Sequence, residues 1–333
     1  MNTAEDRETL SLVVPVLNEE QAIPIFLGRI RLLADQLGNL DMKLEVIFVD
    51  DGSRDMTVHR ILSARSDGFQ IRLVKLSRNF GKDSALAAGL AHATGQAIIP
   101  LDVDLQDPPE LIPLMVDAWK NGAKIVNAKR KSRASDSLFK RTTSRWFYKV
   151  FNRLSDYPLR EDVGDFRLFD RQVVDILNEM PERVRFMKGM FAWVGFEPVT
   201  IEYERPKRSA GNSKWKAWNL WNFALDGITG STTLPLRAWT YVGFTIAFLA
   251  LLLAARLVVN VLIYGIDVPG YASLMVVTLL LGASNLIAVG ILGEYLGRVS
   301  IEVRQRPIYI VDSVTDVSNR EARTEKGKPK VTA

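Results

Sequence analysis

The sequence contains no cysteine and only two histidines, and both shortages limit its chemistry. Without thiols it has neither a disulfide framework nor a thiolate metal site, which is typical of a protein in a reducing compartment. The histidines, His59 and His92, lie in separate polar helical segments, where a solvated position is much commoner than a catalytic or metal-binding role. Any bound metal must therefore be held by oxygen ligands, which favours Mg²⁺ or Mn²⁺.

The first ten residues, MNTAEDRETL, lack an apolar core, so we expect no signal peptide there. The net charge is only +5, but the positive charge is clustered in residues 129–145, in residues 205–216 and after Arg298. Clusters of this kind suit phosphate groups or an anionic membrane surface.

Two long apolar segments, residues 239–265 and 272–293, approach or exceed the roughly 20 residues needed to cross a bilayer. The alternative, a helical hairpin buried in a soluble core, is disfavoured because apolar runs of this length are rare there. The connecting loop IDVPGY has no Lys or Arg, whereas arginines flank the pair outside: Arg237, Arg298, Arg304 and Arg306. The positive-inside bias predicts that both chain ends lie in the cytoplasm.

Residues 10–204 read as strands alternating with helices, the pattern of a mostly parallel sheet. The strand candidates are LSLVVPV (10–16), LEVIFV (44–49), IRLVKL (71–76), QAIIPL (96–101) and KIVNA (124–128). Polar residues follow four of them: Asn18 and Glu19, Asp50 and Asp51, Arg78 and Asn79, and Asp102 and Asp104. Ligands bind at the carboxyl ends of strands in open α/β sheets, so we expect the site there.

Asp102 and Asp104 are two residues apart, so in an extended chain their side chains point the same way and could share one cation. Asp107 has a simpler explanation. It precedes a proline, with Glu110 three residues on, which predicts a capped helix over residues 111–119. Asn18 is likewise predicted to cap the helix between the first two strands.

The segment KWKAWNLWNFAL spaces three tryptophans at intervals of three residues, at 215, 218 and 221. Such a stripe is usually core packing, but beside basic residues and an apolar span it favours an amphipathic helix at the membrane interface. The segment 137–154 has the same mixture of basic and aromatic residues. After residue 312 the chain is charged and lacks core residues, which predicts disorder.

Several ordered motifs together resemble the GT-A glycosyltransferases of family 2 that act on polyprenyl phosphates, a group related to dolichyl-phosphate mannose synthase. They are VVPVLNEE, FVDDGSRD, RNFGKDSALAAGLAHATG, DVDLQDPPE, VGDFRL and GNSKW. A closer resemblance, to the bactoprenol glucosyltransferase group, rests on MPERVRFMKGMFAWVG, PLRAWTYVG and GILGEYLGRVSIEVRQRP. The similarity extends over roughly residues 10–311, including both apolar segments.

The resemblance implies a nucleoside site lined by Pro15, Leu17 and Glu19, with Val49 nearby. Asp51 would hydrogen-bond the base or the ribose. An Asp before Gly52 could instead form a turn, a role that suits Asp50 better than Asp51.

For the diphosphate, the resemblance implies that Asp102, Val103 and Asp104 lie beside it. Asp104 would be the direct metal ligand, Asp102 a second ligand and Gln106 a third. Basic residues would meet the phosphate oxygens, namely Arg130, Arg208 and Lys214. Attraction to lipid headgroups is the alternative role for Arg208 and Lys214.

Asp165 in VGDFRL has two open roles. An inverting transferase with a hydroxyl acceptor needs a base, and Asp165 could be that base. A phosphate acceptor is already largely ionised at pH 7, because its second pKa is about 6. In that case Asp165 would orient the sugar or the acceptor, and a purely structural role is nearly as well supported.

We therefore expect an α/β protein with a GT-A, Rossmann-like catalytic domain (1–204), a phosphate-binding loop and interfacial helices (205–236), a two-helix transmembrane hairpin (237–297) and a C-terminal segment (298–333). The expected reaction is metal-dependent, inverting transfer of glucose from UDP-glucose to undecaprenyl phosphate, for O-antigen-type glycan modification. Another donor, carrying formamido-arabinose, mannose or galactose, remains an alternative.

The resemblance further implies a multi-pass protein of the bacterial inner membrane, homo-oligomeric and tetrameric, with its catalytic domain in the cytoplasm and no nucleic-acid partner. Two rival classes are less favoured. A processive polysaccharide synthase would need a Gln-x-x-Arg-Trp motif and more spans, and a membrane scaffold or pore would not need these acidic and basic motifs.

Overall fold

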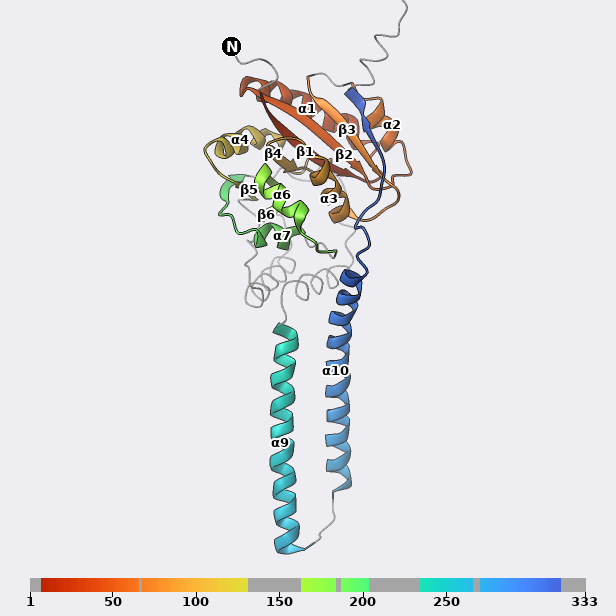
Figure 1. Cartoon of the computed structure of the whole chain (residues 1–333), viewed down its shortest axis with the longest axis vertical. Coiled ribbons are helices and arrows are strands. Elements are labelled where there is room, and N and C mark those ends of the chain that lie inside the picture. Colours follow the sequence, from red (N-terminus) through yellow and green to blue (C-terminus); the bar gives the residue numbers. More distant parts are fainter. Residues whose placement is uncertain are drawn as a thin grey trace, which may run out of the picture. The chain divides into compact units, whose positions relative to one another are not determined.

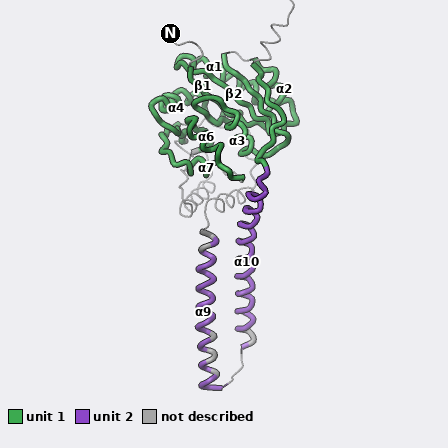
Figure 2. Tube along the Cα trace, in the orientation of Figure 1, with its two compact units in different colours: residues 1–149, 159–214, 307–333 green, residues 150–158, 215–306 purple. Residues whose placement is uncertain are grey.

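The computed structural model describes residues 7–65, 68–130, 163–183, 187–203, 234–265 and 270–318. The chain divides into two compact units (Figure 2). The first comprises residues 1–149, 159–214 and 307–333, and the second comprises residues 150–158 and 215–306. The sheet belongs to the first unit, and two long helices belong to the second (Figure 1).

The described part of the first unit is built on an eight-stranded sheet in the order β7-β5-β6-β4-β1-β2-β3-β8. The strands are β1 (Glu8–Val16), β2 (Met42–Asp50), β3 (Gln70–Leu76), β4 (Ala97–Pro100), β5 (Ile125–Arg130), β6 (Val163–Asp170), β7 (Val199–Tyr203) and β8 (Val311–Asp316). Four pairings are parallel and three are antiparallel, the latter all involving β6 or β8. The prediction of a mostly parallel α/β sheet is confirmed.

Helices lie between the strands: α1 (Ala22–Asn39), α2 (Thr57–Leu62), α3 (Lys82–His92), a 3₁₀ turn η1 (Pro109–Leu111), α4 (Ile112–Lys120), α6 (Arg171–Glu179) and α7 (Met187–Trp193). Successive strand side chains point to opposite faces, so each strand supplies two cores. Leu12 and Val14 of β1 pack with Phe26 of α1, whereas Val13 packs in a second cluster with Leu86 of α3.

All five strands predicted from apolar runs are present, with ends within three residues of the predicted positions. Three further strands were not predicted. β6 contains the VGDFRL motif, and β8 lies in the segment after residue 310. Because β8 pairs antiparallel with β3, and Val317 beyond it is 2% exposed, the expectation of disorder from residue 312 was wrong as far as residue 318.

The predicted helix caps were also wrong in detail. α1 begins at Ala22, and Asn18 instead has a positive φ of 55° and accepts a hydrogen bond from the Arg54 N–H. The turn η1 begins one residue later than a cap at Asp107 requires, and Asp107 accepts a hydrogen bond from the Tyr203 hydroxyl. In both places a contact from a distant part of the sequence replaces the local one.

In the second unit, α9 (Leu234–Tyr264) and α10 (Tyr271–Val303) are continuous helices that expose apolar side chains along their length. Among the described residues, one stretch is long and apolar enough to cross a bilayer, Ser273–Val303, in which an 18-residue window has a mean hydropathy of 2.2. Ala238–Leu253 is a shorter apolar stretch within α9. The predicted span at residues 239–265 therefore stays a prediction. The tryptophan stripe and the segment 137–154 lie outside the described residues.

Candidate active site

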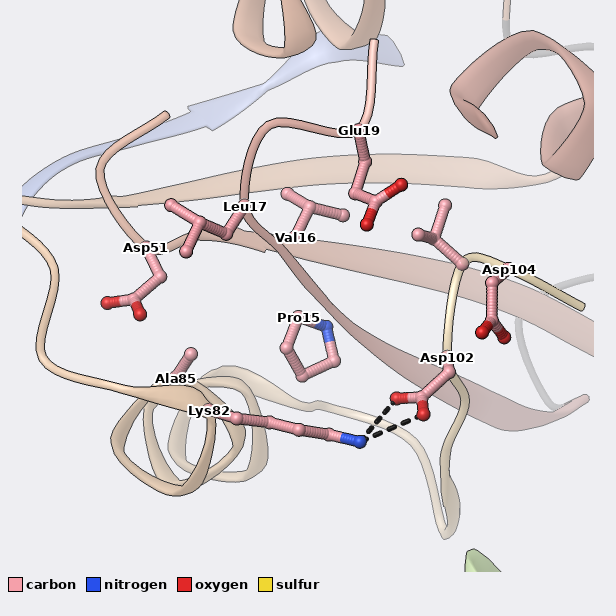
Figure 3. A pocket seen from close by; sticks show the side chains of 10 residues that line it. Pro15, Val16, Leu17, Glu19, Asp51, Lys82, Ala85, Asp102 and Asp104 are labelled. Carbon is pink, nitrogen blue, oxygen red and sulfur yellow. Dashed lines mark hydrogen bonds and ion pairs between the residues drawn. The ribbon is translucent and has the colours of Figure 1, made fainter. Parts of the chain in front are cut away.

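A pocket of about 240 Å³ opens at the carboxyl ends of β1, β2 and β4, beside the first turn of α3 (Figure 3). These three strands are parallel neighbours, so their carboxyl ends meet at one edge of the sheet. The lining residues are Pro15, Val16, Leu17, Glu19, Asp51, Lys82, Ala85, Asp102, Val103 and Asp104. The pocket thus lies at the edge of the sheet where we expected a site.

Lys82, at the start of α3, reaches across the pocket to Asp102, at the end of β4 (Figure 3). Its Nζ lies 2.7 Å from Asp102 Oδ1 and 2.9 Å from Asp102 Oδ2. The same Nζ lies 3.4 Å from Oδ2 of Asp165, on β6. One ammonium group therefore joins two carboxylates that come from different strands.

The pocket shifts the pKa values of these groups. Burial raises the pKa of Asp102, and the positive charge of Lys82 offsets only part of that effect. Burial alone would lower the pKa of Lys82, but Asp102 and Asp165 outweigh it, so its pKa is raised above the ordinary value. Lys82 therefore stays charged at neutral pH, and it is the main compensation for the two acids.

Asp51 connects the end of β2 to the start of α3. Its Oδ1 accepts a hydrogen bond from the Phe80 N–H at 2.7 Å, and its Oδ2 accepts one from the Gly81 N–H at 2.9 Å. Burial raises the pKa of Asp51, although these two hydrogen bonds lower it in part. The turn-forming role belongs to the neighbouring Asp50, which accepts from the Ser53 N–H at 3.1 Å and is fully buried.

Glu19 is positioned by its backbone. Its N–H donates to the Thr57 hydroxyl at 2.8 Å, and the preceding N–H, of Asn18, donates to the Ser53 hydroxyl at 2.9 Å. These contacts join the loop after β1 to the loop after β2. They leave the Glu19 side chain extended along the pocket wall, near Leu17 and Val16 (Figure 3).

The chain turns after Asp102 rather than continuing extended, because the Leu105 N–H donates to the Asp102 carbonyl and Leu105 has a φ of 54°. The predicted extended geometry of Asp102 and Asp104 was therefore wrong, although both still line the pocket. Asp104 is exposed and accepts hydrogen bonds from the backbone N–H and the side-chain amide of Gln106, at 3.1 and 2.5 Å.

The donor set fits a hard divalent cation. Mg²⁺ is usually bound through one or two carboxylates together with substrate phosphates, and Asp102 and Asp104 supply two of the four carboxylates that line this pocket. Within the described ranges, no group of three or more His, Cys, Asp or Glu side chains could hold a metal ion. A cation here would therefore depend on ligands from a bound substrate.

The predicted site residues do not all lie in the pocket. Seven of them line one pocket: Pro15, Leu17, Glu19, Asp51, Asp102, Val103 and Asp104. Asp165 lies beside Asp102 through their shared contact with Lys82. Val49 does not line the pocket, because its side chain is fully buried in the core against α3. Arg130 is the last residue of β5, and its side chain, like Arg208 and Lys214, lies outside the described part of the chain.

Lys82 is the important residue that sequence reasoning missed. A signal was present, because a lysine in the first turn of a helix faces the positive end of the helix dipole. Such a placement is unfavourable unless an acid compensates it, and Asp102 and Asp165 do so here. The sequence did not show which acids these were, since they lie 20 and 83 residues further along the chain.

Comparisons with known proteins agree with this geometry. A family model described as glycosyl transferase family 2 matches residues 11–177. An uncharacterized glycosyltransferase from Synechocystis is 47% identical over 305 residues, covering 92% of this chain and 95% of that protein. A prophage bactoprenol glucosyl transferase homolog from Escherichia coli is 48% identical over 306 residues, covering 92% of this chain and 99% of that protein.

A solved structure of glucosyl-3-phosphoglycerate synthase from Mycobacterium tuberculosis, in complex with Mn²⁺, UDP and phosphoglyceric acid, is more distant. It is 19% identical, with a TM-score of 0.44, covering 68% of this chain and 78% of that one. A likeness of that size carries no argument about the site. The family match and the two relatives show the family. This chain is a glycosyltransferase and belongs to glycosyl transferase family 2.

Proposed function

We propose that this glycosyltransferase moves glucose from UDP-glucose to undecaprenyl phosphate, with inversion at the anomeric carbon. The observation that carries the proposal is the 48% identity, over 306 residues, to a bactoprenol glucosyl transferase homolog. A match of that length includes the pocket and extends into both apolar helices. It therefore covers the parts of the chain that would meet the nucleotide sugar and the lipid.

The pocket suits the nucleotide end of the donor. Pro15 and Leu17 supply an apolar wall for the base, and Glu19 supplies an acceptor for polar groups of the nucleoside. Asp51 uses both carboxylate oxygens on the backbone of Phe80 and Gly81, and each oxygen keeps further acceptor capacity toward the ribose or the base.

Asp102 and Asp104 would hold Mg²⁺ or Mn²⁺, with Gln106 close to Asp104. When bound, the cation would neutralise charge that develops on the departing diphosphate. Arg130, Arg208 and Lys214 would add positive charge around the same phosphates. Val103 would lie beside the diphosphate, through its position between the two acids.

In the reaction, an oxygen of the acceptor phosphate attacks the anomeric carbon, and the bond from that carbon to the UDP oxygen breaks. UDP leaves with the electron pair. Because the acceptor phosphate is already largely ionised at pH 7, no proton has to be removed from it. Asp165, held by Lys82 beside Asp102, would orient the sugar or the acceptor rather than act as a base. Positioning of the two substrates supplies much of the rate enhancement.

The acceptor is a membrane lipid, so the proposal includes a membrane location. α9 and α10 would both span the bacterial inner membrane, with the arginine-rich flanks and the catalytic domain in the cytoplasm. The tryptophan-rich segment before α9 would lie at the interface, and the protein would form a homo-oligomer. Its lipid-linked product would serve O-antigen-type modification of lipopolysaccharide.

The donor and acceptor are tested together. Membranes containing the full chain are incubated with undecaprenyl phosphate and a panel of radiolabelled nucleotide sugars, and labelled lipid is measured. UDP-glucose should give the highest rate. Labelled lipid from only a formamido-arabinose, mannose or galactose donor would keep the reaction type and change the sugar. No labelled lipid from any donor would contradict the proposal.

The metal is tested with Asp104→Asn, which removes a ligand charge. Transfer should fall to near background, although the thermal unfolding temperature should change little, because Asp104 is exposed. EDTA should abolish wild-type transfer, and Mg²⁺ or Mn²⁺ should restore it. Asp35→Asn, at an exposed position on α1, is the matched control and should keep full activity. Undiminished turnover in EDTA would exclude the metal assignment.

A further inference from the structure

Lys82 engages both oxygens of the carboxylate that the proposed cation needs. Its Nζ lies within 2.9 Å of Oδ1 and Oδ2 of Asp102. Figure 3 shows the lysine side chain crossing the pocket floor to reach this acid. A divalent cation that binds Asp102 must therefore displace the ammonium group from at least one oxygen.

The contact is not explained by helix stability. Lys82 is the first residue of α3, where a positive charge opposes the helix dipole. The side chains are also partly exposed, at 49% for Lys82 and 42% for Asp102, and ion pairs of that exposure add little to stability. The ion pair between Lys82 and Asp102 therefore affects binding in the pocket more than it affects the stability of the fold.

A second carboxylate gives the ammonium group an alternative partner. Asp165 Oδ2 lies 3.4 Å from Nζ, so a small movement of the flexible lysine side chain would bring it into full contact with Asp165. Lys82 can thus release Asp102 and still have its positive charge balanced by the carboxylate of Asp165.

We propose that Lys82 is a positioning residue that competes with the divalent cation for Asp102 and moves onto Asp165 when the cation binds. This inference rests on the proposed function in one respect, namely that Asp102 is a ligand of the cation. Before the cation binds, Lys82 keeps the two acids from repelling one another. Afterwards it holds Asp165 in place, so metal binding and the orientation of Asp165 become one event.

The test is Mn²⁺ binding to the purified full chain in detergent, with the same concentration of UDP in every sample, followed by the electron paramagnetic resonance signal of free Mn²⁺. Lys82→Met removes the positive charge that competes with the cation for Asp102, so Mn²⁺ affinity should rise at least about tenfold. A merely structural role predicts weaker binding instead. Lys82→Arg keeps the charge and should stay within about threefold of wild type.

Lys75→Met is the matched control, because Lys75 makes a comparable ion pair with Asp312, at 3.1 Å, between β3 and β8. It should leave Mn²⁺ affinity unchanged. If Lys82→Met does not fold, Lys82→Gln carries the same expectation, since it also lacks the charge. Unchanged or weaker Mn²⁺ binding in the uncharged variants would overturn the competition, whatever the transfer assay shows.

Activity gives a second readout. With Lys82→Met, the Mn²⁺ concentration that gives half-maximal transfer should fall, and kcat should fall as well, because Asp165 has lost its contact with the ammonium group that positions it. A lower kcat with an unchanged Mn²⁺ requirement would also overturn the inference. The two proposals can fail separately. If Asp104→Asn lost Mn²⁺ binding but wild type showed no transfer, the proposed reaction would be contradicted. The competition between Lys82 and the cation would still be supported.

Discussion

The carboxylate of Asp51 accepts a hydrogen bond from the backbone N–H of Gly81 at 2.9 Å. Asp51 follows β2, and Gly81 immediately precedes α3, so this bond attaches the start of α3 to the end of the sheet. Lys82 is the next residue. The place from which Lys82 reaches Asp102 is therefore fixed by an acid that the sequence suggested as a nucleotide contact or as a turn former.

Asp51→Asn should raise the KM for UDP-glucose several-fold. The amide offers one acceptor oxygen in place of two, so the N–H of Phe80 or of Gly81 loses its partner, at a cost of about 1–3 kcal/mol in the free energy of unfolding. Steady-state kinetics and thermal unfolding measure the two effects. Asp41→Asn, in an exposed pair with Arg7, is the control and should change neither.

Gly89→Ala should destabilise the protein by about 1–3 kcal/mol, because an added methyl group overpacks the contact between α3 and the sheet. A Cβ at this position would overlap Val13 Cγ1 and lie 3.1 Å from Val49 Cγ2. The comparison is Gly28→Ala, which is also inside a helix but has no atom within 4 Å of the added Cβ.

Gly28→Ala should be neutral or stabilising by up to about 1 kcal/mol, since alanine loses less backbone entropy in a helix than glycine does. Denaturant unfolding of both variants in detergent measures the difference. Equal effects of the two substitutions would show that α3 does not depend on close approach to β1 and β2.

Asp170→Asn should destabilise the protein at pH 7 but much less below pH 4. Burial would raise the pKa of Asp170, but hydrogen bonds from Trp119 and Lys124, at 2.8 and 3.0 Å, outweigh it and lower that pKa below its ordinary value of 3.8. A lowered folded-state pKa stabilises the protein above pH 3.8, and this stabilisation is lost as the pH falls toward the folded-state pKa.

We expect Asp170→Asn to lower the free energy of unfolding by about 1–3 kcal/mol at pH 7. Thermal unfolding of wild type and Asp170→Asn, from pH 7 to below pH 4, measures the difference. The control is Asp175→Asn on the same helix, because Asp175 is 57% exposed and its Arg171 contact is 3.6 Å long. A difference between wild type and Asp170→Asn that grew toward low pH would have the opposite sign from the one that these hydrogen bonds predict.

Asp165→Asn should lower transfer to undecaprenyl phosphate, and its residual rate should not rise steeply with pH. A phosphate acceptor ionises near pH 6, so no base is needed near neutrality. Undecaprenol, which lacks the phosphate, should not react with wild type at any pH at which the protein stays folded. Product lipid is measured against pH for both proteins and both acceptors.

The mechanism would be wrong if the free alcohol were glycosylated, or if alkaline pH rescued Asp165→Asn. Either result would show that a hydroxyl group is activated by a base. Asp165→Asn should also remove one of the two negative charges that compensate Lys82, which is a separate consequence of the substitution.

Local pattern was sufficient for much of the fold. The apolar runs at 10–16 and 44–49 predict β1 and β2, because burial on both faces of a parallel sheet requires continuous apolar sequence. The family motifs then placed Asp102 and Asp104 at a strand end, and the pocket contains both. Such features depend on neighbours in the sequence, so they can be predicted before the chain is folded.

Contacts between distant segments could not be predicted in this way. β6 brings Asp165 to Lys82, and β8 returns after α10 to pair with β3, because strand order follows from the packing of the whole sheet. Asn18 and Asp107 likewise do not form the predicted helix caps, because they accept hydrogen bonds from Arg54, in the loop after β2, and from Tyr203, at the end of β7. By itself the sequence determined which acids lie at the strand ends. Only the tertiary structure decided that a single lysine joins one of them, Asp102, to Asp165 on β6, since that contact depends on three elements far apart in the chain.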